Sequence, residues 1–149
     1  VREASAFIDG YFRTYPGVKE FIERSHANAR ETGLATTLLG RRRRLNDILS
    51  DNNRMRSFAE RIAVNTPIQG TAADLIKLAM LEVDARLTAE GHESLLLLQV
   101  HDELLLEVPE TELEAVTTLV RVAMEGVMEL NVPLIVDVHT GTNWADAHG

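Results

Sequence analysis

The sequence predicts an α+β fold in which helices cover one face of a small antiparallel sheet. Apolar residues recur at helical spacing in several stretches, most clearly over residues 70–89 and 112–130. Two apolar runs, 95–100 and 104–108, are separated by only three polar residues, as in a strand–turn–strand hairpin. A third apolar run at 135–139 predicts one more strand of the same sheet.

The first part of the chain predicts two helices followed by a hairpin. Apolar side chains at helical spacing indicate helices over residues 3–14 and 17–32, with a proline–glycine pair between them. A short strand over 34–39 follows, and Gly40 allows a tight turn into residues 41–45.

The middle of the chain predicts a loop and two helices. Residues 46–53 are rich in Asn and Asp, which is typical of a loop. A helix is expected from about 54 to 65, ended by Pro67. The next helix is expected from about Gln69 to Ala89.

The last part predicts the hairpin and one further helix. The run Leu95–Leu98 is nearly continuous in apolar residues, which indicates a strand covered on both faces. Thr111 and Glu114 are spaced as a capping box for a helix at about 112–130.

Composition limits the class of protein. The chain has 149 residues, of which 45% are hydrophobic, so it is long enough for one domain with its own core. It has no cysteine, which excludes disulfides and thiolate metal sites. No apolar run approaches the roughly 20 residues of a membrane span, so we expect no membrane partner. The start at Val1, with no signal sequence, indicates an interior segment of a longer cytosolic protein.

Charge is divided unevenly along the chain. Residues 1–70 hold 12 Lys/Arg and 8 Asp/Glu, whereas residues 71–149 hold 3 Lys/Arg and 15 Asp/Glu. A basic half is typical of a surface for a polyanion, and an acidic half suits cations or solvent. Ordinary solvated arginines explain the same numbers, and charge by itself leaves both interpretations open.

Two carboxylates, Asp102 and Glu103, lie at the tip of the otherwise apolar hairpin. Charge in such a place needs compensation, either from water or from a divalent cation such as Mg²⁺, which prefers carboxylate oxygens. Taken by spacing alone, a plain exposed turn is the better interpretation, because Asp is a favoured turn residue.

Arginines and amides gather before the long helix. The arginines form two groups, Arg41–Arg44 and Arg54, Arg56 and Arg61. Guanidinium groups suit phosphate, although such runs are more often a solvated face. Asn65 and Gln69 flank the proline, where they can either cap helices or contact the minor groove of a duplex.

Four blocks of sequence, in order, resemble those of family-A DNA polymerases. Gln99-Val100-His101-Asp102-Glu103-Leu104 is similar to motif C of that family. The other three blocks are Gly40–Arg43, Ala59–Asp74, and Gly141–Trp144 followed by Ala147-His148. Together they span essentially the whole chain.

The resemblance implies a DNA-directed DNA polymerase that transfers nucleotides to a primer 3′-hydroxyl in DNA repair or replication. It implies that Asp102 is a catalytic residue and a ligand of Mg²⁺ in a two-metal site, and that Glu103 supports that site. It also implies that primer–template DNA and a deoxynucleoside triphosphate are partners, in the bacterial cytoplasm or nucleoid.

The resemblance further implies a set of nucleic-acid contacts. Arg61, Asn65 and Gln69 match residues that contact the primer–template duplex, and His101 matches a position near the primer terminus. The remaining basic candidates of this surface are Arg41, Arg42 and Arg56.

The resemblance divides the chain into residues 1–33, the end of the fingers helices, and residues 34–149, the palm with the motif C hairpin. The family's first metal-binding aspartate and its nucleotide-binding helix have no counterpart in the sequence. We therefore expect the remainder of the polymerase chain to be a partner, and the fragment alone to be inactive.

The residues, considered without the resemblance, are also consistent with two other functions. The chain could be a non-catalytic nucleic-acid-binding module that keeps a palm-like surface. It could equally be a structural domain whose acidic hairpin is a solvated turn.

Overall fold

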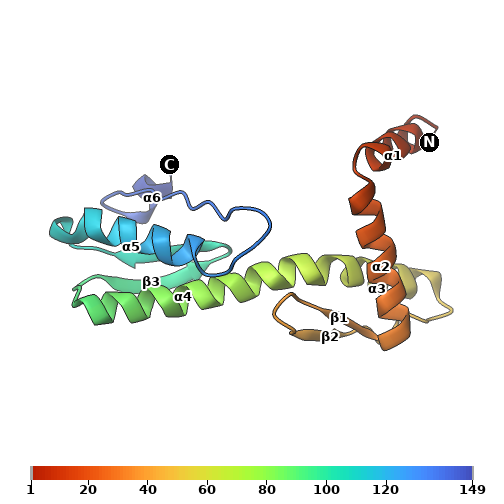
Figure 1. The fold of residues 1–149 in the computed structure, drawn as a ribbon, viewed down its shortest axis with the longest axis horizontal. Helices are drawn as coiled ribbons and strands as arrows, with labels where there is room; N and C mark the ends of the chain where they lie inside the picture. The colour runs from red at the N-terminus through yellow and green to blue at the C-terminus, as the bar shows by residue number, and fades with distance from the viewer. Residues whose placement is uncertain (1, 149) are drawn as a thin grey trace. The chain divides into compact units, whose positions relative to one another are not determined.

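The computed structural model describes residues 2–148, which form two compact units that adjoin in sequence at Thr71 and Ala72 (Figure 1). Helices predominate, and each unit contains one two-stranded antiparallel sheet. The α+β class expected from the sequence is therefore confirmed. None of the helices described is both long and apolar enough to cross a membrane.

The first unit is built mainly of helices. Its elements are α1 (Arg2–Thr14), α2 (Pro16–Thr32), β1 (Leu34–Thr36), β2 (Arg42–Arg44), α3 (Asn53–Asn65) and the π-helical turn η1 (Thr66–Gly70). Gly33 ends α2 in the left-handed region, with φ 70°, and its N–H donates to the Ala29 carbonyl at 2.9 Å. The two strands pair in register from Leu34 opposite Arg44 to Thr36 opposite Arg42.

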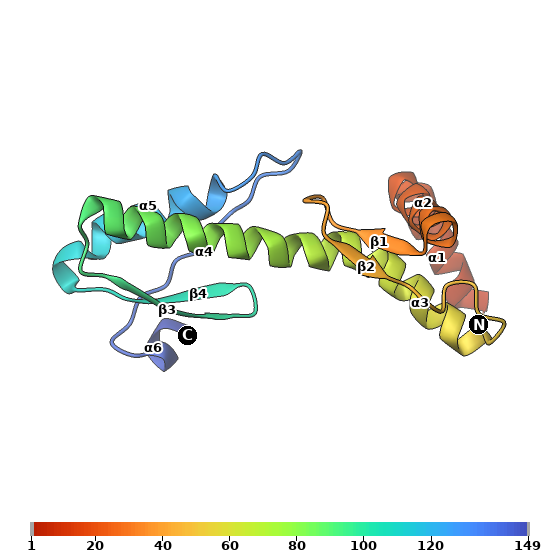
Figure 2. The ribbon, with the colours of Figure 1, turned by 90° about the horizontal axis from the view of Figure 1, so that it is seen from below.

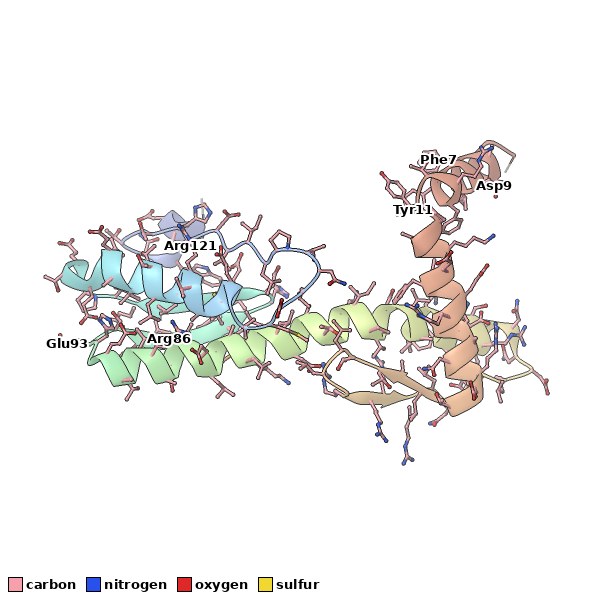
Figure 3. The ribbon with its side chains drawn as sticks, viewed as in Figure 1. Phe7, Asp9, Tyr11, Arg86, Glu93 and Arg121 are labelled. Atoms are coloured by element: carbon pink, nitrogen blue, oxygen red, sulfur yellow. The ribbon has the colours of Figure 1, made fainter. Side chains whose placement is uncertain are left out.

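The core of the first unit lies between α2, α3 and the hairpin. Its buried members are Ala29, Ala35, Leu45, Ile48, Ala59 and Ala63. Most are small, so the helices and the strand approach one another closely. α1 adds no residue to this core, and Phe7 and Tyr11 project from it into solvent (Figure 3).

The helix is not broken at Pro67, contrary to the expectation from the sequence. α3 ends at Asn65, as expected, but η1 follows it directly and leads into Thr71, the first residue of α4. In a regular α-helix the ring of a proline clashes with the carbonyl four residues earlier. The wider π turn accommodates the proline and lets the chain stay helical.

The second unit combines a hairpin with two main helices. Its elements are α4 (Thr71–Glu90, from Ala72 onward), β3 (Leu95–Val100), β4 (Glu103–Glu107), the 3₁₀ turn η2 (Glu110–Glu112), α5 (Leu113–Glu125) and α6 (Trp144–His148). Figure 2 shows the β3–β4 hairpin running beside α4. The core joins α4 to α5 through Val83, Leu87, Val116, Leu119, Val120 and Ala123. Leu104, Leu106 and Val108 pack against it from β4 and the residue that follows.

The hairpin is covered on one face only, so the expectation of a strand buried on both faces is wrong. Leu95, Leu97 and Leu98 of β3 are between 43% and 59% exposed. The register shifts at Leu97, where an extra residue of β3 forms a bulge opposite β4. Leu97 and Leu98, which adjoin at this bulge, are both exposed.

The third strand expected at residues 135–139 does not form. Among the described residues, the segment from Ile135 to His139 has no strand partner. The Val136 N–H donates instead to the Glu125 carboxylate at 3.0 Å. An apolar run becomes a strand only where a free sheet edge meets it, and no such edge does so in the second unit.

The helix expected over 112–130 is shorter, and its capping box is absent. α5 ends at Glu125 because the chain turns at Gly126, whose N–H donates to the Val122 carbonyl at 3.0 Å. The residue before the helix is Glu112, and no side chain caps its first turn. The 3₁₀ turn η2 takes the place in which Thr111 and Glu114 were expected to cap one another.

The division into fingers over residues 1–33 and palm over 34–149 stays a prediction. By its own contacts the chain divides after Thr71, because α2 packs with β1 and α3 in one unit. The two divisions describe different things, namely the packing of this chain and its place in a larger protein.

Candidate catalytic hairpin and nucleic-acid interface

The acidic residues lie at a two-residue turn. Val100 pairs with Glu103, so only His101 and Asp102 form the loop, and Glu103 is the first residue of β4. His101 has φ 55°, the positive value that hairpin turns of the primed types need at their first position. The side-chain amide of Gln99 donates to the His101 carbonyl and holds this conformation.

The hairpin tip presents its carboxylates to solvent. His101, Asp102 and Glu103 are all exposed, and Glu103 is engaged in an interaction of its own. The carboxylate oxygens of Asp102 and Glu103 are the donors that Mg²⁺ prefers. An exposed turn also leaves room for water and phosphate among the ligands of the ion. The donor set therefore fits part of a magnesium site. Across residues 2–148, no three His, Asp or Glu side chains form a group able to hold a metal ion.

The arginine and amide side chains line the end of α3 and η1. Arg61, Asn65 and Gln69 are exposed, and they follow one another at intervals of four residues. The Arg61 guanidinium carbon lies 5.8 Å from the centre of the Phe58 ring, in the range of a cation–π contact.

Asn65 and Gln69 are not used as helix caps. Asn65 precedes η1 in the αR conformation and makes no capping hydrogen bond with its side chain. Neither amide takes part in any side-chain hydrogen bond among the described residues. Both amides are therefore available to a ligand, and the capping alternative does not hold for Asn65.

The other arginines differ in their surroundings. Arg42 is exposed on β2. Arg56 is half-buried, and its guanidinium donates to the Ser50 carbonyl at 2.9 Å and to the Asn53 side chain at 3.1 Å. Arg41 donates to the Gly70 carbonyl at 2.8 Å, which joins the β1–β2 turn to η1.

The candidate residues separate by unit. The first unit holds the basic and amide candidates, which are Arg41, Arg42, Arg56, Arg61, Asn65 and Gln69. The second unit holds His101, Asp102 and Glu103. The charge asymmetry of the sequence thus corresponds to a division between two compact units.

Several residues that shape these sites were not among the candidates. Gln99 holds the acidic turn, while Thr37, Gly70 and Thr71 hold η1. Gln99 had a signal in the sequence, since it is the one polar residue of β3. The other three are ordinary small residues, and only the contact between distant segments reveals them.

The exposed acidic turn and the arginine–amide surface are the two candidate sites of the chain. The family model described as DNA polymerase family A matches residues 1–146, and the chain belongs to this family.

Relatives of known name agree with this family. The chain is 53% identical to DNA polymerase I of Bacillus caldotenax and 52% identical to that of Geobacillus stearothermophilus, over 146 residues in each case. It is 50% identical over 147 residues to DNA polymerase I of Pseudomonas aeruginosa. These matches cover 98–99% of this chain but only 16–17% of the relatives.

A solved structure has the same fold. It is the POL domain of Pol1 from M. smegmatis in complex with DNA primer-template and dNTP. The match has a TM-score of 0.96 at 44% sequence identity, and it covers 99% of this chain and 26% of the other.

Proposed function

We propose that the chain is the motif C part of a DNA-directed DNA polymerase that adds nucleotides to a primer in DNA repair or replication. The observation that carries this proposal is the hairpin tip, where Asp102 and Glu103 stand exposed in a chain of DNA polymerase family A. The similar structure, which is a complex with primer–template and dNTP, supports the same substrates.

Asp102 is the metal ligand of this proposal. It would hold Mg²⁺, which supplies positive charge at the reacting phosphate in a two-metal site. The primer 3′-hydroxyl attacks the α-phosphate of the incoming nucleotide, and pyrophosphate leaves. Glu103, the first residue of β4, supports the site through its charge beside Asp102. His101, the first residue of the turn, is assigned to the primer terminus.

The first unit supplies the contacts to the duplex. Asn65 and Gln69 offer free amide groups, which suit the hydrogen-bond acceptors that every minor groove presents. Arg61 and Arg42 contribute permanent positive charge for phosphate. Arg56 is in the same surface, although part of its guanidinium is already bonded to the loop before α3.

The rest of the enzyme is supplied by a longer chain. The curated relatives are about six times the length matched here, and the sequence lacks a first metal-binding aspartate motif. Apolar side chains on the outer face of β3 and on α1, among them Leu95, Leu97 and Phe7, are exposed and suited to cover by further segments. The fragment by itself is expected to be inactive, and the bacterial relatives favour the cytoplasm as its place of action.

The replacement Asp102→Asn in the full-length polymerase tests the proposal. Loss of a charged metal ligand removes several kcal/mol of transition-state stabilisation, so primer extension should fall at least about a hundredfold. Affinity for primer–template should change little, because the variant keeps the shape of the turn. Extension that stays within about tenfold of the wild type would refute the assignment.

Glu107→Gln is the matched control, since it removes one carboxylate from an exposed position at the far end of β4, the strand that follows the turn. Its extension rate should equal that of the wild type. An equal loss in both variants would attribute the effect to the general charge of the hairpin and would contradict a specific role for Asp102.

A further inference from the structure

The turn between β1 and β2 is attached to η1 by two connections. The Arg41 guanidinium donates to the Gly70 carbonyl at 2.8 Å. The Thr71 hydroxyl donates to the Pro67 carbonyl and accepts a hydrogen bond from the Leu38 N–H at 3.0 Å. The Gly70 carbonyl is therefore held directly by a residue 29 positions earlier in the chain. The Pro67 carbonyl is held by Thr71, whose hydroxyl is in turn bonded by Leu38, 33 positions before it.

The contact between the two segments is close. A Cβ atom placed on Gly70 would lie 2.6 Å from Cγ2 of Thr37, a distance that no real Cβ keeps. Thr37 and Thr71 are both buried. The Thr37 hydroxyl accepts from the Arg41 N–H at 3.1 Å, and its N–H donates to the Arg41 carbonyl at 2.9 Å. The small residue at position 70 is thus required for the turn to reach η1.

One of the proposed DNA contacts, Gln69, lies within the attached segment. Gln69 lies in η1 between the two anchored carbonyls, those of Pro67 and Gly70, and Asn65 immediately precedes η1. A π turn is rare in proteins. Here two of its carbonyls accept hydrogen bonds from side chains outside the turn, and these bonds help to fix its geometry. A small displacement of η1 would move both amides away from a duplex.

We propose that Arg41, together with Gly70 and the Thr37 and Thr71 hydroxyls, positions Asn65 and Gln69 for the primer–template duplex. The role of Arg41 is then to hold the π turn and not to bind phosphate. This inference rests on the proposed function, because it assumes that Asn65 and Gln69 contact DNA.

The dependence of affinity on salt separates the two roles of Arg41. A phosphate contact releases counterions, and its loss lowers the slope of log Kd against log salt by about 0.9. Loss of a positioning residue weakens binding but leaves that slope unchanged. In the full-length polymerase we expect Arg41→Ala to weaken primer–template binding by about tenfold with an unaltered slope. Arg41→Lys keeps the charge but not the planar guanidinium, and should recover only part of the loss.

Gly70→Ala tests the same attachment without any change of charge. The added methyl group collides with Thr37 and should weaken binding about as much as Arg41→Ala. Thr37→Ser removes the methyl group with which the new side chain at position 70 collides, and it keeps the Thr37 hydroxyl. The double variant Gly70→Ala/Thr37→Ser should therefore bind within about twofold of the wild type, which a general loss of folding would not allow.

Arg43→Ala is the control for charge, because Arg43 is exposed on β2 and has no bond to η1. Three results would each overturn the positioning role. The salt slope could fall with Arg41→Ala, Gly70→Ala could bind as the wild type does, or Thr37→Ser could fail to restore binding in Gly70→Ala. Asn65→Ala and Gln69→Ala complete the set. If Asn65→Ala and Gln69→Ala both bind DNA as the wild type does, the proposed DNA contacts themselves are wrong. If these two variants weaken binding while Arg41→Ala and Gly70→Ala do not, only the positioning role is wrong.

Discussion

Glu112 shows how a residue's surroundings decide its role. Its carboxylate accepts hydrogen bonds from the Ser94 hydroxyl at 2.6 Å, from the Glu93 N–H at 2.9 Å and from the Ser94 N–H at 3.0 Å. His92 lies 3.5 Å from the same carboxylate. Glu112 stands where the sequence predicts the start of the helix over 112–130. In the structure its carboxylate holds the backbone just before β3.

These bonds make the second unit sensitive to acid. The Ser94 hydroxyl, followed by the Glu93 N–H, lowers the pKa of Glu112 from its usual 4.5 to about 2, against the opposing effect of burial. A depressed pKa means that the folded state favours the charged form. The resulting stabilisation is complete above about pH 4.5 and is lost as the pH falls from 4.5 towards 2.

Glu112→Gln should therefore lower the stability of the chain at pH 7 and flatten its dependence on pH below 4.5. Urea unfolding at a series of pH values measures both effects. Glu114→Gln is the control, since Glu114 is exposed and lies in the first turn of α5. The same loss of pH dependence in the control would assign the effect to charge in general.

Among elements, the helix from α3 to α4 departs most from its prediction. Pro67 is a strong local signal for a helix end, and the sequence contains nothing that overrides it. The π turn persists because Arg41, Thr71 and the β1–β2 turn satisfy its carbonyls from outside. Arg41 bonds Gly70 from 29 positions away and Leu38 bonds Thr71 from 33 positions away, so no local pattern can include them.

The start of α3 follows local rules and gives a prediction for that element. Asn52 is its N-cap, and its side-chain oxygen accepts from the Arg54 N–H at 3.0 Å. Asn52→Ala leaves that donor without its partner and should destabilise the first unit by about 0.5–2 kcal/mol. Thermal unfolding followed by circular dichroism measures the change. Asn46→Ala, in the exposed loop before the helix, should leave the Tm unchanged, and an equal effect of both would argue against capping.

At the scale of the whole molecule, the chain has two cores with no residue in common. One gathers small residues of α2, β1 and α3, and the other joins α4, α5 and β4. The basic surface belongs to the first unit and the acidic turn to the second. Each compact unit therefore has its own core and its own candidate site.

A core substitution should act within its own unit. Leu87 is 3% exposed in the second core, so Leu87→Ala should destabilise that unit by about 2–5 kcal/mol. Native-state hydrogen exchange should show lost protection in α4 and α5 and little change in α2 and α3. Leu81→Ala, on the same helix but 68% exposed, should cost less than about 0.5 kcal/mol. Equal loss of protection in both units would contradict two separate cores.

The sequence by itself determined the family, the α+β class and most element positions. Local rules suffice for these features, since helical spacing, Gly33 and the residues around Asp102 act over a few positions. The same locality explains the correct placement of Asp102 at a turn.

Only the tertiary structure decided whether an apolar run finds a partner and what each polar group bonds to. Residues 135–139 have the pattern of a strand but meet no sheet edge, and β3 has an apolar outer face that this chain leaves exposed. Arg41 looks like any surface arginine until the fold brings it to the Gly70 carbonyl. The physical reason is the same in each case: strand pairing, burial and hydrogen bonding join segments that are distant in the chain, so no stretch of sequence contains both partners.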